Sequence, residues 1–535
     1  MQRLSFLPRL AFWLFCLAAG AAHAALDPAL VNGLAGDDSD AKLAAVEQVT
    51  QLPEETARRI LNALNEDALV TAGGQLFILR DGAATDPETG APVTAPADAE
   101  SVTLNNRVRR ELNGALAALR LVSANRDTRL SAAREFEASA DADMAPKLAK
   151  ALEKETDREI KRLLALAHAR ATLESADAAE RLAAVKTLGG SGNPGVKQLL
   201  ENMLEKKGAD FAEPDAGVRA EAAVSLKAVQ SRLSVSENIS RAFTGLSLGS
   251  ILLLAALGLA ITYGVMGVIN MAHGELLMIG AYTTFAVQSL FRAYAPQSLD
   301  WYVVAAVPAS FFAAAVVGMV MERTVIRHLY GRPLETLLAT WGLSLVLIQG
   351  ARTLFGAQNV EVANPAWMSG GVELMANVVL PWNRVVIIAF SAGVVLLVWA
   401  LMNLTRLGMF VRAVTQNRAM AGCVGVPTGR VDTMAFGIGA GIAGLGGCAL
   451  SQIANVGPDM GQGYIVDSFM VVVLGGVGQL AGAVWAALGL GVLTKFLEGW
   501  TGAVIAKIAV LVFIIIFIQK RPQGLFALKG RFVES

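Results

Sequence analysis

Three hydrogen-bonding side chains lie close together in an apolar stretch of the sequence. Asn270, His273 and Glu275 fall within six residues inside the segment 257–285, and glycines flank them. An amide, an imidazole and a carboxylate are costly at membrane depth, where such groups commonly mark the path of a transported solute. The glycines let helices approach closely or let a helix break. The segment therefore predicts either a transport pathway or a polar contact that only holds helices together.

The spacing of these residues gives a test of the two interpretations. If the segment is helical, Asn270 and His273 lie one turn apart and face the same cavity, whereas Glu275 points elsewhere. If His273 lies on the pathway, we expect His273→Ala to lower transport while assembly stays intact. If His273 only joins helices, the same substitution should lower the amount of folded protein.

The elements that must position these residues belong to the second half of the chain. Between Ala25 and Ser240 there are 26 Lys and Arg against 34 Asp and Glu, a net charge of −8. From Arg241 to Ser535 the count is 17 against 11, a net charge of +6. The second half consists of apolar runs of about 20 residues, the length that crosses a bilayer. The composition predicts an integral membrane protein with an additional soluble domain.

The N-terminus is typical of an export signal. Residues 1–24 carry Arg3 and Arg9, then a short apolar core, and end in the small-residue pattern of a cleavage site. We expect cleavage after Ala24, although retention as a membrane anchor stays open. The mature chain would keep only Cys423 and Cys448, so neither a disulfide in the exported domain nor a cysteine metal site is expected.

The region 25–235 repeats a helical pattern in which a helix opens with an acidic residue. Asp127, Asp177 and Asp215 each precede apolar residues at helical spacing, and each carboxylate can accept from free N–H groups at a helix start. The pattern resembles HEAT-like α-solenoid repeats. We therefore predict a secreted helical-repeat domain.

Residues 68–100 depart from the helical pattern. Two β-prone runs flank Gly73 and Gly74, which predicts a hairpin and a small β insertion. No catalytic constellation is present in this domain, and His168 is expected to be a solvated helix residue. The predicted fold class is all-α, with a helical-repeat domain that carries a β insertion followed by a membrane helix bundle.

The membrane half, 241–528, is predicted to contain about nine spans with defined orientation. Basic residues at 323–332, 406–430 and 520–531 predict cytoplasmic segments, and 355–381 has no Lys or Arg and is expected outside. Counting back places the N-terminal domain in the periplasm of a cell whose inner membrane holds the bundle. The predicted spans are 243–266, 274–291, 301–321, 334–354, 382–403, 431–452, 465–479, 480–497 and 502–519, with the pair at 465–497 uncertain by one.

Several segments of this half resemble the permeases that import branched-chain amino acids through ABC transporters. The residues that carry the resemblance are Gly267–Tyr282, Arg332–Leu334 with Leu338–Ser344, Gly475–Gly478 and Arg521–Leu525. Within that family, the secreted helical extension and the run Gly461–Phe469 look most like the urea-type permease. His273 matches the shared motif, whereas Asp467 belongs to the urea-like run.

The resemblance implies partners and a division of labour. A permease of this type works with a second permease subunit, two cytoplasmic ABC ATPases and a periplasmic substrate-binding protein, and it is not itself an enzyme. It would carry urea inward with ATP hydrolysed by the partners, along a pathway that includes Asn270, His273, Glu275 and Asp467. No cofactor, metal or nucleic acid is expected, and no nucleotide-binding motif is present.

The polar loop Thr405–Arg430 is the expected ATPase-coupling element. Its mixture of polar and apolar residues suits a short amphipathic helix that lies in a groove of an ATPase. An ordinary basic loop set by the positive-inside bias is the alternative. The residues proposed for coupling are Arg412, Gln416, Asn417, Arg418 and Gly425.

The substrate and the transport class both have alternatives. The scarcity of charge in the spans favours neutral urea, which needs only donors and acceptors, but a branched-chain amino acid or a short amide remains open. An ion-coupled secondary carrier would need paired repeats and ionisable groups near the midplane. A membrane-anchored scaffold would leave the motif at Asn270–Glu275 unexplained.

Overall fold

The computed structural model describes residues 26–36, 38–80, 82–96, 98–207, 210–267, 269–375, 378–522 and 524–526. The predicted signal segment 1–24 lies outside these residues. The chain divides into two compact units, Met1–Arg232 and Leu233–Ser535. The helix α11, Ala216–Met266, begins in the first unit and ends in the second over 51 residues.

The first unit is built mainly from short helices. A two-stranded pair, β6 (Lys206–Lys207) and β7 (Asp210–Phe211), follows them. The helices are α2 (Pro28–Ala35), α3 (Ser39–Val49), α4 (Glu54–Asn65), α5 (Asn106–Leu121), α6 (Arg126–Ser139), α7 (Ala145–Lys154), α8 (Arg158–Ala171), α9 (Ala178–Leu188) and α10 (Pro194–Leu204).

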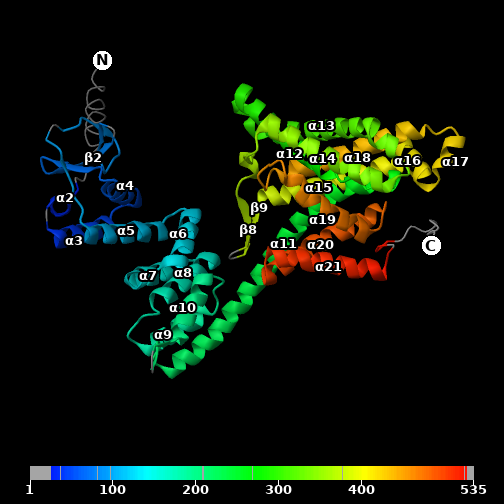
Figure 1. Cartoon of the computed structure of the whole chain (residues 1–535). Coiled ribbons are helices and arrows are strands. Elements are labelled where there is room, and N and C mark those ends of the chain that lie inside the picture. Colours follow the sequence, from blue (N-terminus) through cyan, green and yellow to red (C-terminus); the bar gives the residue numbers. More distant parts are fainter. Residues whose placement is uncertain are drawn as a thin grey trace, which may run out of the picture. The chain divides into compact units, whose positions relative to one another are not determined.

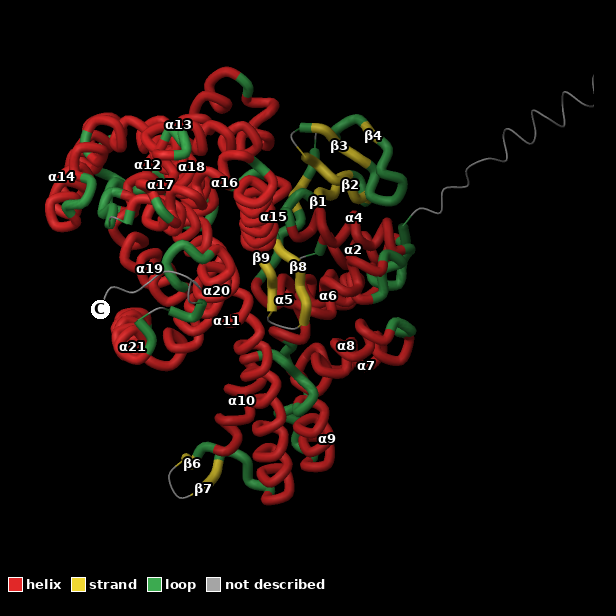
Figure 2. Tube along the Cα trace, turned by 90° about the vertical axis from the view of Figure 1, so that its right-hand side faces the viewer, coloured by secondary structure: helices red, strands yellow, loops and turns green. Residues whose placement is uncertain are grey.

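A small antiparallel sheet interrupts these helices, which confirms the predicted β insertion. Gly73 and Gly74 connect its first two strands with φ of +58° and +76°, values that favour glycine. The sheet packs beside α2 and α4 (Figure 2). Its strand order is β4-β3-β2-β1-β5, with β1 (Leu69–Ala72), β2 (Gln75–Arg80), β3 (Ala83–Thr85), β4 (Pro92–Val93) and β5 (Glu100–Ser101).

The helix starts of the first unit repeat one arrangement of hydrogen bonds. Asp177 caps α9 and Asp215 accepts from the N–H of Val218 at the start of α11, as predicted. The prediction for Asp127 is wrong, because Asn125 caps α6 and Asp127 is already in its first turn. The side chain of an amide residue two positions earlier reaches the free N–H group first.

Buried arginine–glutamate pairs join helix starts that are distant in sequence. Arg181 donates to Glu213 at 2.8 and 3.0 Å and to the carbonyls of Ser175 and Ala176. The hydrogen bond from Arg181 lowers the pKa of the Glu213 carboxyl, against the opposing effect of burial. Arg129 makes the equivalent contacts with Glu155 and with the carbonyls of Ser123 and Ala124, so the arrangement recurs along the unit.

The second unit is a bundle of long apolar helices. A hairpin of β8 (Gly371–Met375) and β9 (Val378–Pro381) lies between two of them. After α11 the helices are α12 (His273–Tyr294), α13 (Tyr302–Thr324), α14 (Pro333–Phe355), α15 (Trp382–Leu404), α16 (Arg406–Gln416), α17 (Arg418–Cys423), α18 (Thr428–Leu450), α19 (Met460–Gly475), α20 (Leu480–Thr501) and α21 (Ala503–Lys520).

Within the described residues, seven helices are long and apolar enough to cross a membrane. The sequence predicts nine spans, and the two others correspond to α12, which is not apolar enough by the same measure, and α19, which has only 16 residues. Gly475 ends α19 and Leu480 begins α20, so the uncertain pair at 465–497 consists of two separate helices.

A glycine-lined helix, α18, lies at the centre of the bundle. Helices α12, α13 and α18 all pack on one another (Figure 1). A Cβ on Gly280 of α12 would overlap the backbone of Gly444 on α18, and a Cβ on Gly444 would in turn overlap the α13 backbone at Ser310. Gly258 of α11 and Gly439 of α18 are so close that a Cβ on either would overlap the other's backbone. Small residues therefore set the distances between these helices.

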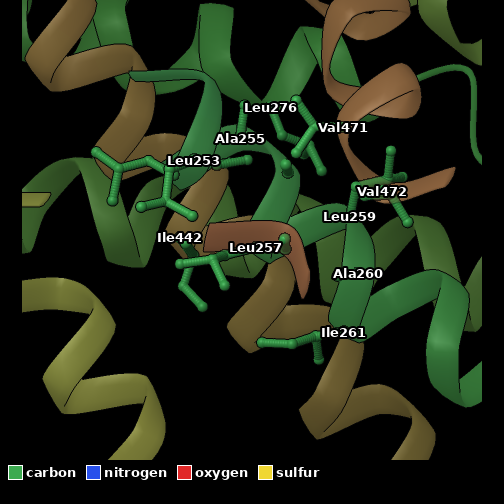
Figure 3. Packing of buried hydrophobic residues seen from close by; sticks show 14 of the residues in the cluster. Leu253, Ala255, Leu257, Leu259, Ala260, Ile261, Leu276, Ile442, Val471 and Val472 are labelled. Atoms are coloured by element: carbon green, nitrogen blue, oxygen red, sulfur yellow. The ribbon is translucent and has the colours of Figure 1, made fainter. Parts of the chain in front are cut away.

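Apolar side chains of α11 fill the space between the central helices. In Figure 3, Ile442 of α18 lies beside Leu257 of α11, and Leu276 of α12 lies beside Val471 of α19. All belong to one buried cluster. This core fixes the start of α12, on which two of the predicted pathway residues, His273 and Glu275, lie.

Candidate functional site

The predicted pathway residues lie where the chain breaks between α11 and α12. Helix α11 ends at Met266, Gly267 takes a φ of +66°, and α12 begins only at His273. Asn270 therefore precedes the helix, and its Oδ1 accepts from the N–H of Ala272 at 3.1 Å. The conditional prediction that Asn270 and His273 lie one helical turn apart does not apply, because the glycine break replaces the helix there.

His273 is fully buried and bonded to the backbone of α11. Its Nε2 lies 3.0 Å from the carbonyl oxygen of Ala255. Because a carbonyl only accepts, Nε2 carries the proton and Nδ1 is left as an acceptor without a partner among the described residues. A Cβ on Gly258 would lie 3.1–3.2 Å from the ring, so the imidazole packs tightly against α11. This geometry is that of a polar contact between helices.

Glu275 lies where two helix starts converge. Its Oε1 accepts from the hydroxyl of Ser344 on α14 at 2.9 Å. Its Oε2 has no hydrogen-bond partner among the described residues, although the residue is only 1% exposed. Gly274 of α12 touches Gly461 of α19, and a Cβ on Gly461 would lie 2.8 Å from this Oε2. The N-terminal ends of both helices favour negative charge, which accounts for a carboxylate here.

Asp467 belongs to a different part of the bundle. Its carboxylate pairs with the ammonium of Lys507 on α21 at 3.3 Å, and the same ammonium lies 3.5 Å from the carbonyl of Gly463. In the part of the chain that the structure describes, no hydrogen bond or ion pair joins Asp467 to Asn270, His273 or Glu275. The four predicted pathway residues are thus not brought into one site.

Sequence reasoning missed an ion pair close to Glu275. Arg352, near the end of α14, donates to both carboxylate oxygens of Asp459 at 2.8 and 2.9 Å, just before α19. Asp459 comes two residues before Gly461, which lies against Gly274 and beside Oε2 of Glu275. Tyr282 stacks on Phe355 with ring centroids 4.5 Å apart, and its buried hydroxyl has no partner among the described residues. The charge of Arg352 near the end of the predicted span 334–354 was the feature of the sequence that could have indicated this pair.

The proposed coupling residues Arg412 and Gln416 lie on α16. The guanidinium of Arg412 donates to the carbonyl of Met402 at 2.9 Å and to Oδ1 of Asn403 at 3.1 Å, which ties α16 to the end of α15. Arg412 and Gln416 also line a cavity of about 550 Å³ together with parts of α11, α15 and the segment 477–481. Arg412 therefore has a structural role as well as an exposed surface.

The other three coupling residues shape the turn into α18. Asn417 caps α17 by accepting from the N–H of Met420 at 2.9 Å, and Gly425 turns the chain with a φ of +89°. Arg418 forms an ion pair with the buried Asp432 of α18 and lies over the ring of Tyr330, 4.3 Å from its centroid. Arg418 therefore fastens the loop to the bundle.

Exposed apolar side chains accompany these residues on the same two helices. Met409 is 52% exposed, Met420 61% and the adjacent Val424 74%. We call these three residues the loop apolar patch. A polar loop that presents such residues can pack against a partner protein.

Two of the segments that carry the family resemblance meet at the end of α19. The N–H of Leu525 donates to the carbonyl of Leu474 at 2.8 Å, and Gly524 lies against Gly476. The free carbonyl at the end of α19 is thereby satisfied by the segment Arg521–Leu525. Across the described ranges, no group of three His, Cys, Asp or Glu residues is placed to hold a metal ion.

The membrane half matches known transport proteins. The family model described as the permease component of branched-chain amino acid transport systems matches residues 241–519. BraD of Pseudomonas aeruginosa, a high-affinity branched-chain amino acid transport system permease protein, is 29% identical over 287 residues, which are 52% of this chain and 93% of BraD. LivH of Escherichia coli, with the same description, is 29% identical over 299 residues, which are 54% of this chain and 94% of LivH.

A more distant relative is also a branched-chain amino acid transport permease. The probable branched-chain amino acid transport permease protein LivH of Methanocaldococcus jannaschii is 23% identical over 291 residues, 52% of this chain and 88% of that protein. No solved structure matches the chain. The match to the family model covers more than half of the chain and nearly the whole bundle. The chain therefore belongs to the family of branched-chain amino acid ABC transport permeases, and it is a multi-pass membrane component rather than an enzyme.

Proposed function

We propose that this chain is the membrane-spanning subunit of an ATP-driven importer for branched-chain amino acids. The family match over 241–519 carries the proposal, because it spans every helix from the end of α11 to α21. The buried polar atoms of Asn270 and Glu275, on either side of the start of α12, support a transport protein over a scaffold.

The proposed importer includes partners that the family resemblance implies. These are a second permease subunit, two cytoplasmic ABC ATPases and a periplasmic substrate-binding protein. The loop apolar patch is the surface that we assign to the ATPase, because short helices with exposed apolar residues commonly dock in grooves of partners. Arg418 would transmit movement of the loop to α18 through Asp432.

The N-terminal unit is proposed to be a periplasmic, HEAT-like helical-repeat domain. The distribution of basic residues and the export-type N-terminus support this location. The recurring contacts of Arg129 and Arg181 support a repeat architecture. A reporter that is active only in the periplasm, fused after residue 235, should be active. Activity of a cytoplasm-only reporter at the same site would overturn the proposed topology.

Urea is the second candidate substrate, and two observations favour it. The run Gly461–Phe469 resembles the urea-type permease, and the N-terminal unit lies outside the residues 241–519 that the family model matches. The charges of Asp467 and Lys507 neutralise each other, so they offer a charged ligand no free partner. Against this, the relatives are known as branched-chain amino acid transport permeases.

Reconstitution tests the proposed function directly. The chain, its second permease subunit and the ATPases would be placed in proteoliposomes with the binding protein outside and ATP inside. Uptake of radiolabelled leucine that depends on ATP hydrolysis supports the proposal. Uptake of urea without leucine would replace the substrate, and uptake driven by an ion gradient without ATP would overturn the transport class.

A further inference from the structure

Two helix starts and an ion pair bring charge to one place in the bundle. Helices α12 and α19 begin next to each other, where Gly274 touches Gly461. Glu275 extends into this junction with its Oε2 unpartnered and the residue 1% exposed. An unpaired carboxylate oxygen in a buried site is costly unless a donor reaches it. The junction therefore lacks a hydrogen-bond donor that a ligand could supply.

The ion pair beside the junction is open to exchange of partners. The side chains of Arg352 and Asp459 are 40% and 63% exposed, and exposed ion pairs contribute little to stability. Asp459 stands immediately before α19, two residues before Gly461, against which Oε2 of the buried Glu275 lies. The accessible guanidinium of Arg352 thus lies next to the accessible carboxylate of Asp459, and the buried carboxyl group of Glu275 follows at the junction.

We propose that Arg352, Asp459 and Glu275 recognise the two charged ends of a zwitterionic amino acid. The guanidinium of Arg352 would bind the carboxylate of the ligand, and the carboxylates of Asp459 and Glu275 would bind its ammonium group. The proposal rests on the importer function proposed above and assigns the substrate class to residues. Ser344 and Gly461 cover Glu275 in this structure, so the ammonium reaches it only when α12, α14 and α19 separate.

The chemistry of the site distinguishes amino acids from neutral solutes. Nη2 of Arg352 donates to both carboxylate oxygens of Asp459, and the carboxylate of a zwitterion can accept from the same guanidinium in place of Asp459. Urea has no charge, so if it separated Arg352 from Asp459 it would leave the charges of both side chains unneutralised. The site sets one cation beside two carboxyl groups, Asp459 and Glu275, and this excess of acceptors favours the ammonium end.

The test uses the full importer in proteoliposomes and three single variants. Arg352→Gln, Asp459→Asn and Glu275→Gln keep similar shapes and remove one charge each. At saturating loaded binding protein we expect the turnover of leucine uptake to fall at least tenfold. The concentration of loaded binding protein that gives half-maximal uptake should stay unchanged. Arg332→Gln is the matched control, since Arg332 forms an exposed pair with Glu335 at the other end of α14, and it should leave turnover within twofold.

A charge-exchanged double variant separates recognition from stability. Arg352→Asp combined with Asp459→Arg restores an ion pair but reverses its direction relative to Glu275. Recognition predicts that leucine turnover stays low although the assembled complex is recovered. Full recovery of turnover would overturn the proposal, because a structural pair does not depend on direction. A higher half-maximal concentration of binding protein in the single variants would also overturn it, since the pair would then dock that protein.

The outcomes keep this inference apart from the proposed function. ATP-dependent leucine uptake that is insensitive to all three variants would refute the site and leave the importer intact. Absence of ATP-dependent uptake of either leucine or urea by the assembled wild-type complex would refute the importer itself. ATP-dependent uptake of urea alone would retain an importer but exclude a zwitterion site.

Discussion

Replacing His273 by alanine should destabilise the bundle rather than block a pathway. The ring is fully buried, and its Nε2 donates to the carbonyl of Ala255. Loss of one hydrogen bond costs about 1 kcal/mol, and truncation of a large buried side chain leaves a cavity that costs roughly 2–5 kcal/mol. We therefore expect His273→Ala to lower the free energy of unfolding by about 3–6 kcal/mol.

The assay measures folded protein and transport separately. Thermal unfolding of the purified complex in detergent and the yield of assembled complex report stability, and both should fall. Uptake normalised to assembled complex should stay within about twofold of wild type. Leu276→Ala is the matched control on the same helix, because it removes a fully buried apolar side chain, at roughly 2–5 kcal/mol, without a side-chain hydrogen bond. His273→Gln keeps a donor and should recover part of the loss.

One result would refute this reasoning. If His273→Ala left the unfolding temperature and yield unchanged while normalised uptake fell tenfold, the imidazole would belong to the pathway. That is the outcome expected from the sequence if His273 lines the pathway. The bond to Ala255 and the tight contact with Gly258 are the observations that shift the expectation toward stability.

Three further predictions follow from contacts elsewhere in the chain. Asp432→Asn removes the ionic partner of Arg418, so uptake per ATP hydrolysed should fall severalfold in proteoliposomes while ATPase binding persists; an unchanged ratio would contradict the coupling role. Gly444→Val would place side-chain atoms on the α13 backbone and lower the free energy of unfolding by at least about 1–3 kcal/mol. Size-exclusion chromatography should then show less assembled complex. Gly489→Ala is the control and should be tolerated, because no neighbouring atom lies where the new Cβ would be. The pKa of Glu213 is lowered in the folded state. Its contribution to the stability of the first unit is therefore fully present above its ordinary pKa and is lost as the pH falls through the lowered value. Thermal unfolding of a fragment ending at Arg232 should therefore lose stability on acidification, and Glu213→Gln should reduce that loss.

Local patterns in the sequence predicted the elements of the bundle well. The apolar runs gave the positions of the long helices, and the glycines at 475–478 marked the break before α20. Gly73 and Gly74 gave the hairpin of the first unit. These features depend on hydrophobicity and on backbone freedom at single positions, which the residues themselves carry.

Contacts between distant segments could not be predicted in the same way. The partner of Glu275 is Ser344, 69 residues later, and the partner of Asp467 is on α21. Nothing local in the sequence indicates these pairs, because they arise from the packing of whole helices. Arg418 was expected to contact an ATPase, but in the structure its guanidinium forms an ion pair with the buried Asp432 of α18. Asp459 was overlooked because it stands outside an apolar run.

The glycines of α18 also bear on the order in which the protein is made. Six glycines lie between Gly437 and Gly447, and 89% of the most apolar stretch of α18 is buried in protein, against 22% for α15. The helices against which α18 packs, α11, α12 and α13, all leave the ribosome before it. Because α18 is less apolar than α15 and is almost enclosed by protein, α18 should enter the bilayer by joining helices that are already there, whereas α15 should insert alone. Placed singly in a host membrane protein, α15 should therefore span the bilayer more efficiently than α18.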